Sequence, residues 1–473
     1  MDLLPQGIKG SKTQMAYNHK KVRQSLLQSF FLSLFVAFNV FLCYQLLFTT
    51  SFFHLPFFCK QDIKINNPKH NLSQTPCSSL TNNTICCDRT NYHSDICFMI
   101  GDVRTHSPSS SIFLYSSSND TNLIPQEEKI KPYTRKWEGP IMVHIDELHL
   151  RTIHSPNASL PCDVHHNVPA LFFSAGGYTG NVFHAFNNGL LPLYITSHHL
   201  QRQLVLVVLQ YRHWWFTKYQ EILAQLSEYT PIDFSNDSRI HCFPSAIVGL
   251  HFHGTLAVNP TELSDNKSIT DFHCMLDKAY KSKVEQIPSQ NLKERSSKPP
   301  KLVIVSRDGT RVIENEAKVS HLAEEIGFDV EVLKPGNMMA MERIYRSLSS
   351  CDVMMGVHGA ALTHFLFMRP GSSMFIQIVP LGIEQLAWSC FGEAAIRMGL
   401  RYEEYRILPR ESSLYWMYGG DDPVVKDPNG TKAKGWEMTK EVYLEGQNVT
   451  LDLGRLKKTL VGALQYVVSK RRY

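Results

Sequence analysis

Several short motifs that mark nucleotide- and metal-binding proteins are missing from this sequence. It contains no Gly-x-Gly-x-x-Gly fingerprint and no P-loop, which argues against a dinucleotide-dependent enzyme or an NTPase. No two cysteines have the Cys-x-x-Cys spacing, and no two histidines the His-x-x-x-His spacing, that would favour a zinc site. The net charge is +5 without a dense basic stripe, so nucleic acid is not an expected partner. The sequence therefore predicts no metal site.

Charged side chains are also missing from Gln24 to Cys59, and the interior of this stretch, Phe30 to Phe48, is rich in Phe, Leu and Val. About 20 such residues suffice to cross a bilayer. Positive charge is concentrated before the stretch, and no small-residue cleavage site follows it. The pattern predicts residues 1–28 as a cytosolic tail, residues 29–50 as a retained transmembrane signal anchor, and the rest of the chain in the secretory lumen.

Glycosylation sequons and cysteines agree with a lumenal location. The chain carries eight Asn-x-Ser/Thr sequons, all beyond the anchor, at Asn71, Asn82, Asn119, Asn157, Asn236, Asn266, Asn429 and Asn448. Ten of the eleven cysteines also lie beyond the anchor. In an oxidising lumen we expect some of them to pair, with the cluster from Cys77 to Cys97 as a staple for a loop-rich segment.

The 473 residues exceed what one core usually holds, so two domains are expected after the ends are set aside. Residues 51–135 are rich in Asn, Ser, Thr and Pro and are predicted to be a lumenal stem. Regular structure is expected from Trp137, with Ile141–Ile145 as a first strand. Strand and helix patterns then alternate over residues 136–290, which predicts an α/β domain with a parallel, doubly wound sheet. Residues 281–300 read as a linker.

The sequence indicates that the chain is organised around residues 174–197. An apolar run, Leu171 to Phe173, predicts a strand, and a turn with Gly176, Gly177 and Gly180 follows it. The next residues have helical spacing, with Val182, Phe186 and Leu190 on a core face. A second, polar face would carry Asn181, His184 and Asn188. Such a polar face is typical of a helix that lines a binding pocket. The alternative is an ordinary structural helix whose one histidine has its hydrogen bonds satisfied within the protein.

The strand–helix pattern is clearest in residues 291–410. Predicted strands are 302–306, 328–333, 352–357 and 374–379, and predicted helices are 314–326, 338–349 and a segment that ends near Arg369. This βαβ series predicts a second Rossmann-like domain, with residues 411–473 packing back on the catalytic domains.

Three features of this second domain follow strand ends, where open parallel sheets bind ligands. Arg307 and Arg311 suit a diphosphate, although a solvated loop is the alternative. The turn from His358 to Thr363 would offer helix N–H groups to a phosphate, or would only be a tight strand–helix crossing. The third feature is Glu384, a carboxylate that would hold the two hydroxyls of a ribose, although a single Glu is a weak signal. No Asp-x-Asp is present, so arginines and N–H groups would neutralise a diphosphate without a metal.

Five segments together resemble plant glycosyltransferase family 61, in particular its xylan arabinosyl- and xylosyltransferase branch. They are SAGGYTGNVFHAFNNGLLPLYIT, IVSRDGTRVIEN, GVHGAALTHFLFMRPG, VPLGIEQLAW and FGEAAIRMGLRYEEYRILPRESSL. The resemblance runs from Trp137 to the C-terminus. It implies a single-pass type II Golgi membrane protein of GT-B fold, with two Rossmann-like domains facing across a cleft. It also implies an inverting enzyme that uses UDP-pentoses without an essential metal and transfers them to xylan or another glycan. A homo- or hetero-oligomer is left open.

The resemblance also implies roles for individual residues. Arg307 and Arg311 would contact the UDP phosphates, and Glu384 would lie near the nucleotide. The diphosphate turn would consist of His358, Gly359, Ala360 and Thr363. The first-domain stretch would line the sugar side with Gly176, Gly177 and Asn181.

One departure from the family pattern concerns the catalytic base. Family members often carry Asp at the position of Asn188, and an amide cannot act as a base. Either His184 takes the proton of the acceptor, or the chain is slow or differently selective. Gln385 stands where an aromatic residue is frequent. Two other functions therefore stay open: transfer to N-glycans or protein O-glycans, and a catalytically impaired subunit that binds a nucleotide sugar or glycan.

Overall fold

The computed structural model describes residues 77, 82–115, 125–153, 160–284, 298–336 and 339–471. These residues belong to one compact unit, Cys59–Tyr473. The predicted tail and anchor lie outside the described residues, as do the sequons at Asn71, Asn119 and Asn157. Within the ranges described, no helix is both long and apolar enough to cross a membrane.

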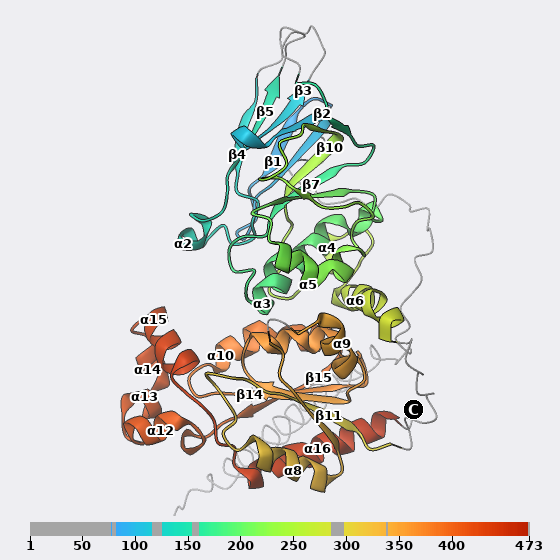
Figure 1. The fold of residues 1–473 in the computed structure, drawn as a ribbon. Helices are drawn as coiled ribbons and strands as arrows, with labels where there is room; N and C mark the ends of the chain where they lie inside the picture. Colours follow the sequence, from blue (N-terminus) through green and yellow to red (C-terminus); the bar gives the residue numbers. More distant parts are fainter. Residues whose placement is uncertain are drawn as a thin grey trace, which may run out of the picture. The chain divides into compact units, whose positions relative to one another are not determined.

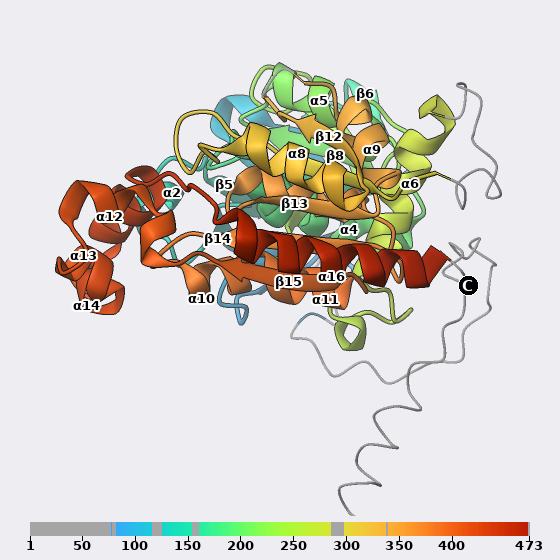
Figure 2. The same ribbon diagram turned by 90° about the horizontal axis from the view of Figure 1, so that it is seen from below.

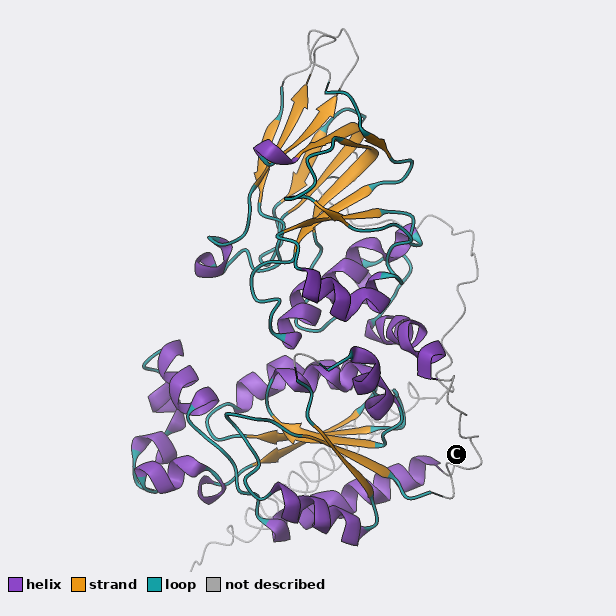
Figure 3. Cartoon of the chain, in the orientation of Figure 1, coloured by secondary structure: helices purple, strands orange, loops and turns teal. Residues whose placement is uncertain are grey.

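The first sheet has ten strands in the order β4-β5-β3-β2-β10-β7-β8-β9, with β1 paired to β2 and β6 to β10 (Figure 1, Figure 3). The strands are β1 (Ile85–Asp88), β2 (Ile96–His106), β3 (Ser111–Tyr115), β4 (Glu127–Ile130), β5 (Leu148–Ile153), β6 (Val164–His165), β7 (Ala170–Ser174), β8 (Val205–Leu209), β9 (Ile232–Asp233) and β10 (His241–Gly249). The predicted strand before the glycine turn is confirmed as β7, and the next apolar run as β8. Both are fully buried.

Three predictions for this half are wrong. Regular structure begins at β1 rather than near Trp137, because β2 alternates buried and accessible residues within a segment whose composition suggested a stem. Residues 141–145 form no strand: α2 (Gly139–Met142) has Pro140 in its first turn and includes Ile141, and Val143 is exposed. The sheet is mixed rather than parallel, because β2 pairs antiparallel with β10 and β3.

Disulfides close loops of this half. Cys77 bonds to Cys86 and Cys87 to Cys97, so the predicted cysteine staple is confirmed. A third disulfide joins Cys162 to Cys242. Four sequon asparagines are exposed, namely Asn82, Asn236, Asn266 and Asn429. Asn448 differs, because its Oδ1 accepts a hydrogen bond of 3.0 Å from the backbone N of Val312.

Helices follow the strands of the first sheet. They are α3 (Val182–His184), the π-helical η2 (Ala185–Leu190), α4 (Leu191–Ser197), α5 (His213–Leu223) and α6 (Ile269–Val284), with short 3₁₀ turns η1 (Ser107–Ser109), η3 (His198–Leu200) and η4 (Pro260–Glu262). As predicted, Phe186 and Leu190 are buried, and Val182 packs against the same core.

The second sheet has five strands, all parallel, in the order β12-β11-β13-β14-β15. They are β11 (Lys301–Val305), β12 (Asp329–Leu333), β13 (Val353–Val357), β14 (Met374–Val379) and β15 (Arg401–Arg406). The predicted strands at 302–306, 328–333, 352–357 and 374–379 are confirmed within a residue or two. Chain order reverses between β11 and β13, and such a switch point is where open α/β sheets bind ligands.

Helices cover both faces of the second sheet (Figure 1, Figure 2). On one face α8 (Glu316–Ile326) packs against α16 (Leu453–Arg471), and Gly327 ends α8 with a left-handed φ of 115° as predicted. The other helices are α9 (Met341–Ser349), the 3₁₀-helical η5 (Ala360–Phe367), α10 (Glu384–Ala387), the π-helical η6 (Trp388–Gly392) and α11 (Glu393–Arg397). A helix after β13 was predicted, and it takes the tighter 3₁₀ form.

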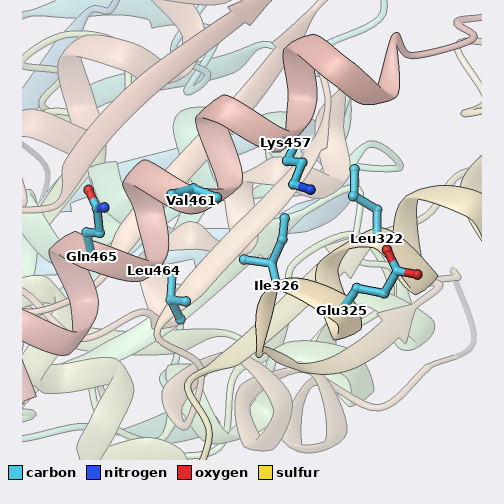
Figure 4. Close-up of a pocket in the computed structure, with 7 residues that line it drawn as sticks. All are labelled: Leu322, Glu325, Ile326, Lys457, Val461, Leu464 and Gln465. Atoms are coloured by element: carbon cyan, nitrogen blue, oxygen red, sulfur yellow. The ribbon is translucent and has the colours of Figure 1, made fainter.

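The C-terminal segment returns to this sheet. It contains η7 (Pro409–Glu411), α12 (Ser413–Tyr418), α13 (Pro423–Lys426), α14 (Pro428–Lys432), α15 (Trp436–Met438) and the π-helical η8 (Thr439–Glu445) before α16. Val449 bridges the backbone of Ile313 and of Ser412. A hollow of about 300 Å³ lies between α8 and α16. Its lining residues, drawn in Figure 4, include Leu322 and Val461 but no predicted site residue.

Helices from the two halves share one apolar core. Tyr280 of α6 contacts Phe367 of η5, with ring centroids 5.8 Å apart. Two polar contacts add to this packing: His273 Nδ1 donates to the carbonyl of Leu366 at 2.8 Å, and the Tyr345 hydroxyl donates to Asp277 at 3.0 Å. The helical segment after the glycine turn (α3, η2 and α4) and η5 after β13 therefore contribute to one apolar core.

Candidate active site

Two arginines lie just beyond the carboxyl end of β11. Arg307 Nε donates to the carbonyl of Thr310 at 3.1 Å, which folds its side chain back over its own loop. Arg311 has a left-handed φ of 57°, and its backbone N donates to the carbonyl of Gln447 at 2.8 Å. Its Nη1 donates to the carbonyl of His358 at 3.1 Å, so the loops after β11 and β13 are joined.

Among the described residues these two guanidinium groups have no carboxylate at ion-pair distance, and the more distant charge of Glu445 offsets only part of the charge of Arg311. Within the same part of the chain, Arg311 Nε is buried without a hydrogen-bond partner. Burial lowers the pKa of Arg307, and burial together with the neighbouring Arg307 lowers the pKa of Arg311 to about 10. An anion bound here would relieve both costs, which is the behaviour expected of a phosphate site.

His358 lies between these arginines and the core. It is 5% exposed, and burial, with Arg311 and Arg307 adding to it, lowers its pKa to about 3. Gln377 Nε2 donates to His358 Nδ1 at 2.8 Å, so the neutral ring carries its proton on Nε2. The oxygen of that amide lies 2.7 Å from the Tyr402 hydroxyl and Glu404 lies 3.0 Å from it, so the two acceptors share its single proton. This chain of bonds makes His358 a fixed, neutral hydrogen-bond donor.

Gly359 is needed because Arg307 lies against it. A Cβ at this position would lie 1.8 Å from Arg307 Nη1, although the φ of 163° is open to any residue. Ala360 then begins η5, and the first N–H groups of a helix lack intrahelical partners. Thr363 is completely buried, and among the residues that the structure describes its hydroxyl has no hydrogen-bond partner, so its side chain is not accessible to a ligand in solution.

Glu384 lies at the start of α10, after β14. Its Oε1 accepts from the backbone N of Gly382 at 3.2 Å. Glycine is required at position 382 because its φ of 80° is left-handed and because a Cβ would collide with the ring of Tyr443. Gln385 is exposed. One helical turn further, Trp388 is 42% exposed and lies edge-on to Tyr402, so an accessible aromatic side chain is present near this position after all.

On the first-sheet side, His184 and Asn188 are bonded to each other. His184 Nδ1 lies 2.8 Å from Asn188 Oδ1, and an amide oxygen only accepts, so Nδ1 carries the proton and Nε2 keeps its lone pair. Burial lowers the pKa of His184, which favours the neutral ring. Asn188 is 2% exposed, and its backbone carbonyl accepts a hydrogen bond from the Thr134 hydroxyl at 2.9 Å. Asn188 lies within the π-helical turn η2, and His184 directly precedes this turn as the last residue of α3; π-helical turns are frequent at functional sites.

The other residues of this stretch shape the turn. Asn181 Oδ1 accepts from the backbone N of Phe183 at 2.9 Å and caps α3. Gly177 has a φ of 61°, and a Cβ there would collide with the ring of Tyr133. A Cβ at Gly176 would collide with the side chain of Gln210. These three residues place His184 through the backbone.

Phe391 connects the two groups of residues. Its ring contacts Phe183 at a centroid distance of 5.6 Å and His358 at 5.4 Å, and Phe183 directly precedes His184. Phe391 therefore contacts both the ring of His358 and the residue that precedes His184.

Comparison with known proteins identifies the family. The profile of Glycosyltransferase 61 matches residues 183–375. The Xylan glycosyltransferase MUCI21 of Arabidopsis thaliana is 50% identical over 401 residues, which is 82% of this chain and 81% of MUCI21. From Oryza sativa subsp. japonica, Beta-1,2-xylosyltransferase XYXT1 is 36% identical over 80% of this chain and 83% of its own. Alpha-1,3-arabinosyltransferase XAT3 is 36% identical over 80% of this chain and 64% of its own.

The chain belongs to glycosyltransferase family 61. The region matched by the family 61 profile, residues 183–375, contains His184, Asn188, both arginines and the whole turn after β13, whereas Glu384 and Phe391 lie beyond it. No cluster of three or more His, Cys, Asp or Glu suited to a metal ion occurs in the described ranges.

Reasoning from the sequence missed several residues of this glycosyltransferase site. Gln377 carried a signal, since it is the one polar residue in the buried strand MFIQIV. The supporting residues Tyr402 and Glu404 on β15 carried none, because neighbouring strands of a parallel sheet are far apart in sequence. Arg135, whose charge acts on His184, was also missed, because residues 51–135 were taken for a stem.

Proposed function

We propose that this family 61 glycosyltransferase moves a pentose, arabinofuranose or xylose, from a UDP-sugar to side-chain positions of xylan with inversion of the anomeric centre. The observation that carries the proposal is the Arg307–Arg311 pair, which no carboxylate of a described residue meets at ion-pair distance, beside neutral His358, joined through Phe391 to the His184–Asn188 pair. The names of MUCI21, XYXT1 and XAT3 support xylan and pentoses as substrates.

On the donor side, the two guanidinium groups would bind the diphosphate and stabilise the charge that develops on it as the glycosidic bond breaks. The Nε2–H of His358 would add a hydrogen bond without adding charge. Because two cations would offset the leaving group, we propose that no metal is essential. Glu384, whose second oxygen accepts no hydrogen bond from a described residue, is the proposed contact to the ribose hydroxyls.

On the acceptor side, His184 Nε2 would take the proton of the attacking hydroxyl as the new bond forms. Asn188 positions the ring by accepting the proton of Nδ1 and would not itself transfer a proton. A transition state of oxocarbenium character needs the hydroxyl in line with the departing diphosphate. A GT-B arrangement, with a donor half and an acceptor half, would provide that alignment.

We further propose that the protein works as a single-pass type II protein of the Golgi membrane with its catalytic part in the lumen. The uncharged stretch before residue 60 supports the anchor. The disulfides and the exposed sequon asparagines support an oxidising, glycosylating compartment.

The test incubates the full chain with xylohexaose and either UDP-xylose or UDP-arabinofuranose, in buffer containing EDTA. We expect transfer of one pentose to the oligosaccharide, with an anomeric configuration opposite to that of the donor by NMR. UDP-glucose and a panel of N-glycan and O-glycan peptides serve as controls. Transfer to the glycopeptides instead of xylohexaose, or binding of UDP-sugars without any transfer, would contradict the proposal.

A further inference from the structure

A row of planar side chains leads from the surface to His184. The ring of Tyr178 lies against that of His184, with centroids 4.8 Å apart. The guanidinium carbon of Arg135 lies 5.3 Å from the centroid of Tyr178 and 4.8 Å from that of Trp137. The rings of Trp137 and Tyr92 are parallel to within 7° with centroids 6.3 Å apart. Consecutive members of this row, Tyr92–Trp137–Arg135–Tyr178, are thus in contact up to the proposed base.

Polar contacts hold the row in place. Glu138 forms an ion pair with Arg135 and accepts a hydrogen bond of 2.7 Å from the Tyr178 hydroxyl. The backbone N of Tyr178 donates to the hydroxyl of buried Tyr133 at 3.1 Å. Lys136 pairs with Asp95 at 2.6 Å, which ties the segment carrying Trp137 to the segment carrying Tyr92. The aromatic side chains are therefore preorganised, and binding would cost little conformational entropy.

The three aromatic members of the row are open to solvent, whereas the Arg135 side chain between them is 16% exposed. Tyr92 is 69% exposed, Trp137 44% and Tyr178 36%. Single exposed aromatic side chains need no explanation, but a connected set that ends at a proposed catalytic group is the kind of patch that marks a binding surface.

We propose that the row Tyr92–Trp137–Arg135–Tyr178 binds the acceptor glycan on the side of His184 and carries several successive sugar units of one extended chain. This inference rests on the proposed function and extends it from the reacting sugar to its neighbours. Tyr and Trp offer rigid apolar faces with polar tips, which match the C–H faces and hydroxyl edges of sugar rings. Glu138 neutralises Arg135, so the row suits an uncharged chain, and its length suits an oligosaccharide better than a single sugar.

The test measures transfer by the full chain to xylobiose, xylotetraose and xylohexaose at saturating UDP-sugar. For Trp137→Ala and Tyr92→Ala we expect KM for xylohexaose to rise about two- to tenfold each, the range of an aromatic contact. The KM for xylobiose, the kcat and the KM for the UDP-sugar should stay unchanged, because the outer rings lie away from the donor site. Trp137→Phe should recover most of the affinity.

Trp416→Ala is the matched control, since Trp416 of α12 is 73% exposed and lies outside the row. Thermal melting with and without UDP establishes that each variant folds and binds the donor. If the wild-type chain transfers to xylo-oligosaccharides but Trp137→Ala and Tyr92→Ala leave the dependence on chain length unchanged, the row is not an acceptor site. The same conclusion follows if the variants instead lose binding of a protein partner. If the wild-type chain transfers to none of these acceptors, the proposed function itself fails.

Discussion

His184 donates its Nδ1 proton to Asn188 Oδ1 over 2.8 Å, one turn further along the same helical segment. The residue that appeared to be a missing base is thus the group that orients the histidine. An amide at this position fixes the ring in the tautomer whose Nε2 lone pair is free, and it does so without adding charge to a buried site. The arrangement is compatible with an active enzyme, so Asn188 no longer argues for an impaired subunit.

Removing the two members of this pair should affect turnover differently. His184→Ala removes the proposed base and should lower kcat by about 10²- to 10⁴-fold. Asn188→Ala removes only one orienting hydrogen bond and should lower kcat by about three- to tenfold. Binding of UDP, measured by thermal shift, should be the same for both variants and the wild-type chain. An equal loss of kcat in the two variants would contradict the division into base and positioning residue.

Asn188→Asp should change the pH dependence of the reaction. A carboxylate would accept the same proton but would stabilise the protonated ring, which raises the pKa of His184 from its lowered value. Since the base must be neutral to act, activity is lost as the pH falls through this pKa. We therefore expect the acidic limb of kcat against pH to move to higher pH, with turnover retained at alkaline pH. A large gain in turnover at every pH would instead identify the carboxylate as the better base.

The arginine pair should determine donor affinity. Arg311→Gln should raise the Kd for UDP by about ten- to a hundredfold, because it removes a charged hydrogen-bond donor from a buried phosphate site. Arg311→Lys should recover little, since Lys cannot both reach the carbonyl of His358 and present a planar fork. Arg397→Gln is the control, as Arg397 pairs with Glu393 on the surface of α11. An unchanged Kd for UDP in Arg311→Gln would show that the diphosphate binds elsewhere.

Gly359→Ala tests the close approach of Arg307. The backbone at Gly359 permits Ala, so the added Cβ should displace the guanidinium, 1.8 Å away, rather than unfold the chain. We expect weaker UDP binding with a nearly unchanged melting temperature. Gly462→Ala is a useful counterpart in α16, where a Cβ meets nothing within 4 Å; it should stabilise the protein by about 0.5–1 kcal/mol and leave UDP binding alone. Normal UDP affinity in Gly359→Ala would show that Arg307 is not part of the site.

His358 should make the protein sensitive to acid. Its pKa is about 3 in the folded protein against an ordinary 6.5, so between these values the unfolded chain binds a proton that the folded chain does not. Stability is therefore complete above pH 6.5 and falls as the pH drops toward 3, by about 1.4 kcal/mol per pH unit for one histidine. Denaturant unfolding of the wild-type chain and of His358→Gln at pH 7, 6, 5 and 4 measures the difference. Equal slopes for the two chains would contradict this assignment.

Prediction from the sequence succeeded where secondary structure follows from local pattern. The strands β11 to β14 are short apolar runs bounded by turn residues, and their order along the chain implies parallel pairing through helical crossovers. Arg307 and His358 followed from the same logic, because both lie directly after predicted strands. The pairing in the first sheet was predicted wrongly, because β2 and β10 are neighbours in the sheet but more than a hundred residues apart in the sequence. No local sequence pattern indicates which distant strand will pair with β2.

By itself, the sequence determined the family, the glycine turn with its histidine, and the positions of the arginines and of the turn after β13, because each depends on residues close together along the chain. Only the tertiary structure decided what those residues do to one another. It paired Asn188 with His184, placed Gln377 behind His358, and set Phe391 between the two halves. It also brought Tyr92 beside Trp137. Hydrogen-bond partners, tautomers and charges without an ion-pair partner depend on the burial and distance of groups from separate elements, and these are properties of the folded chain.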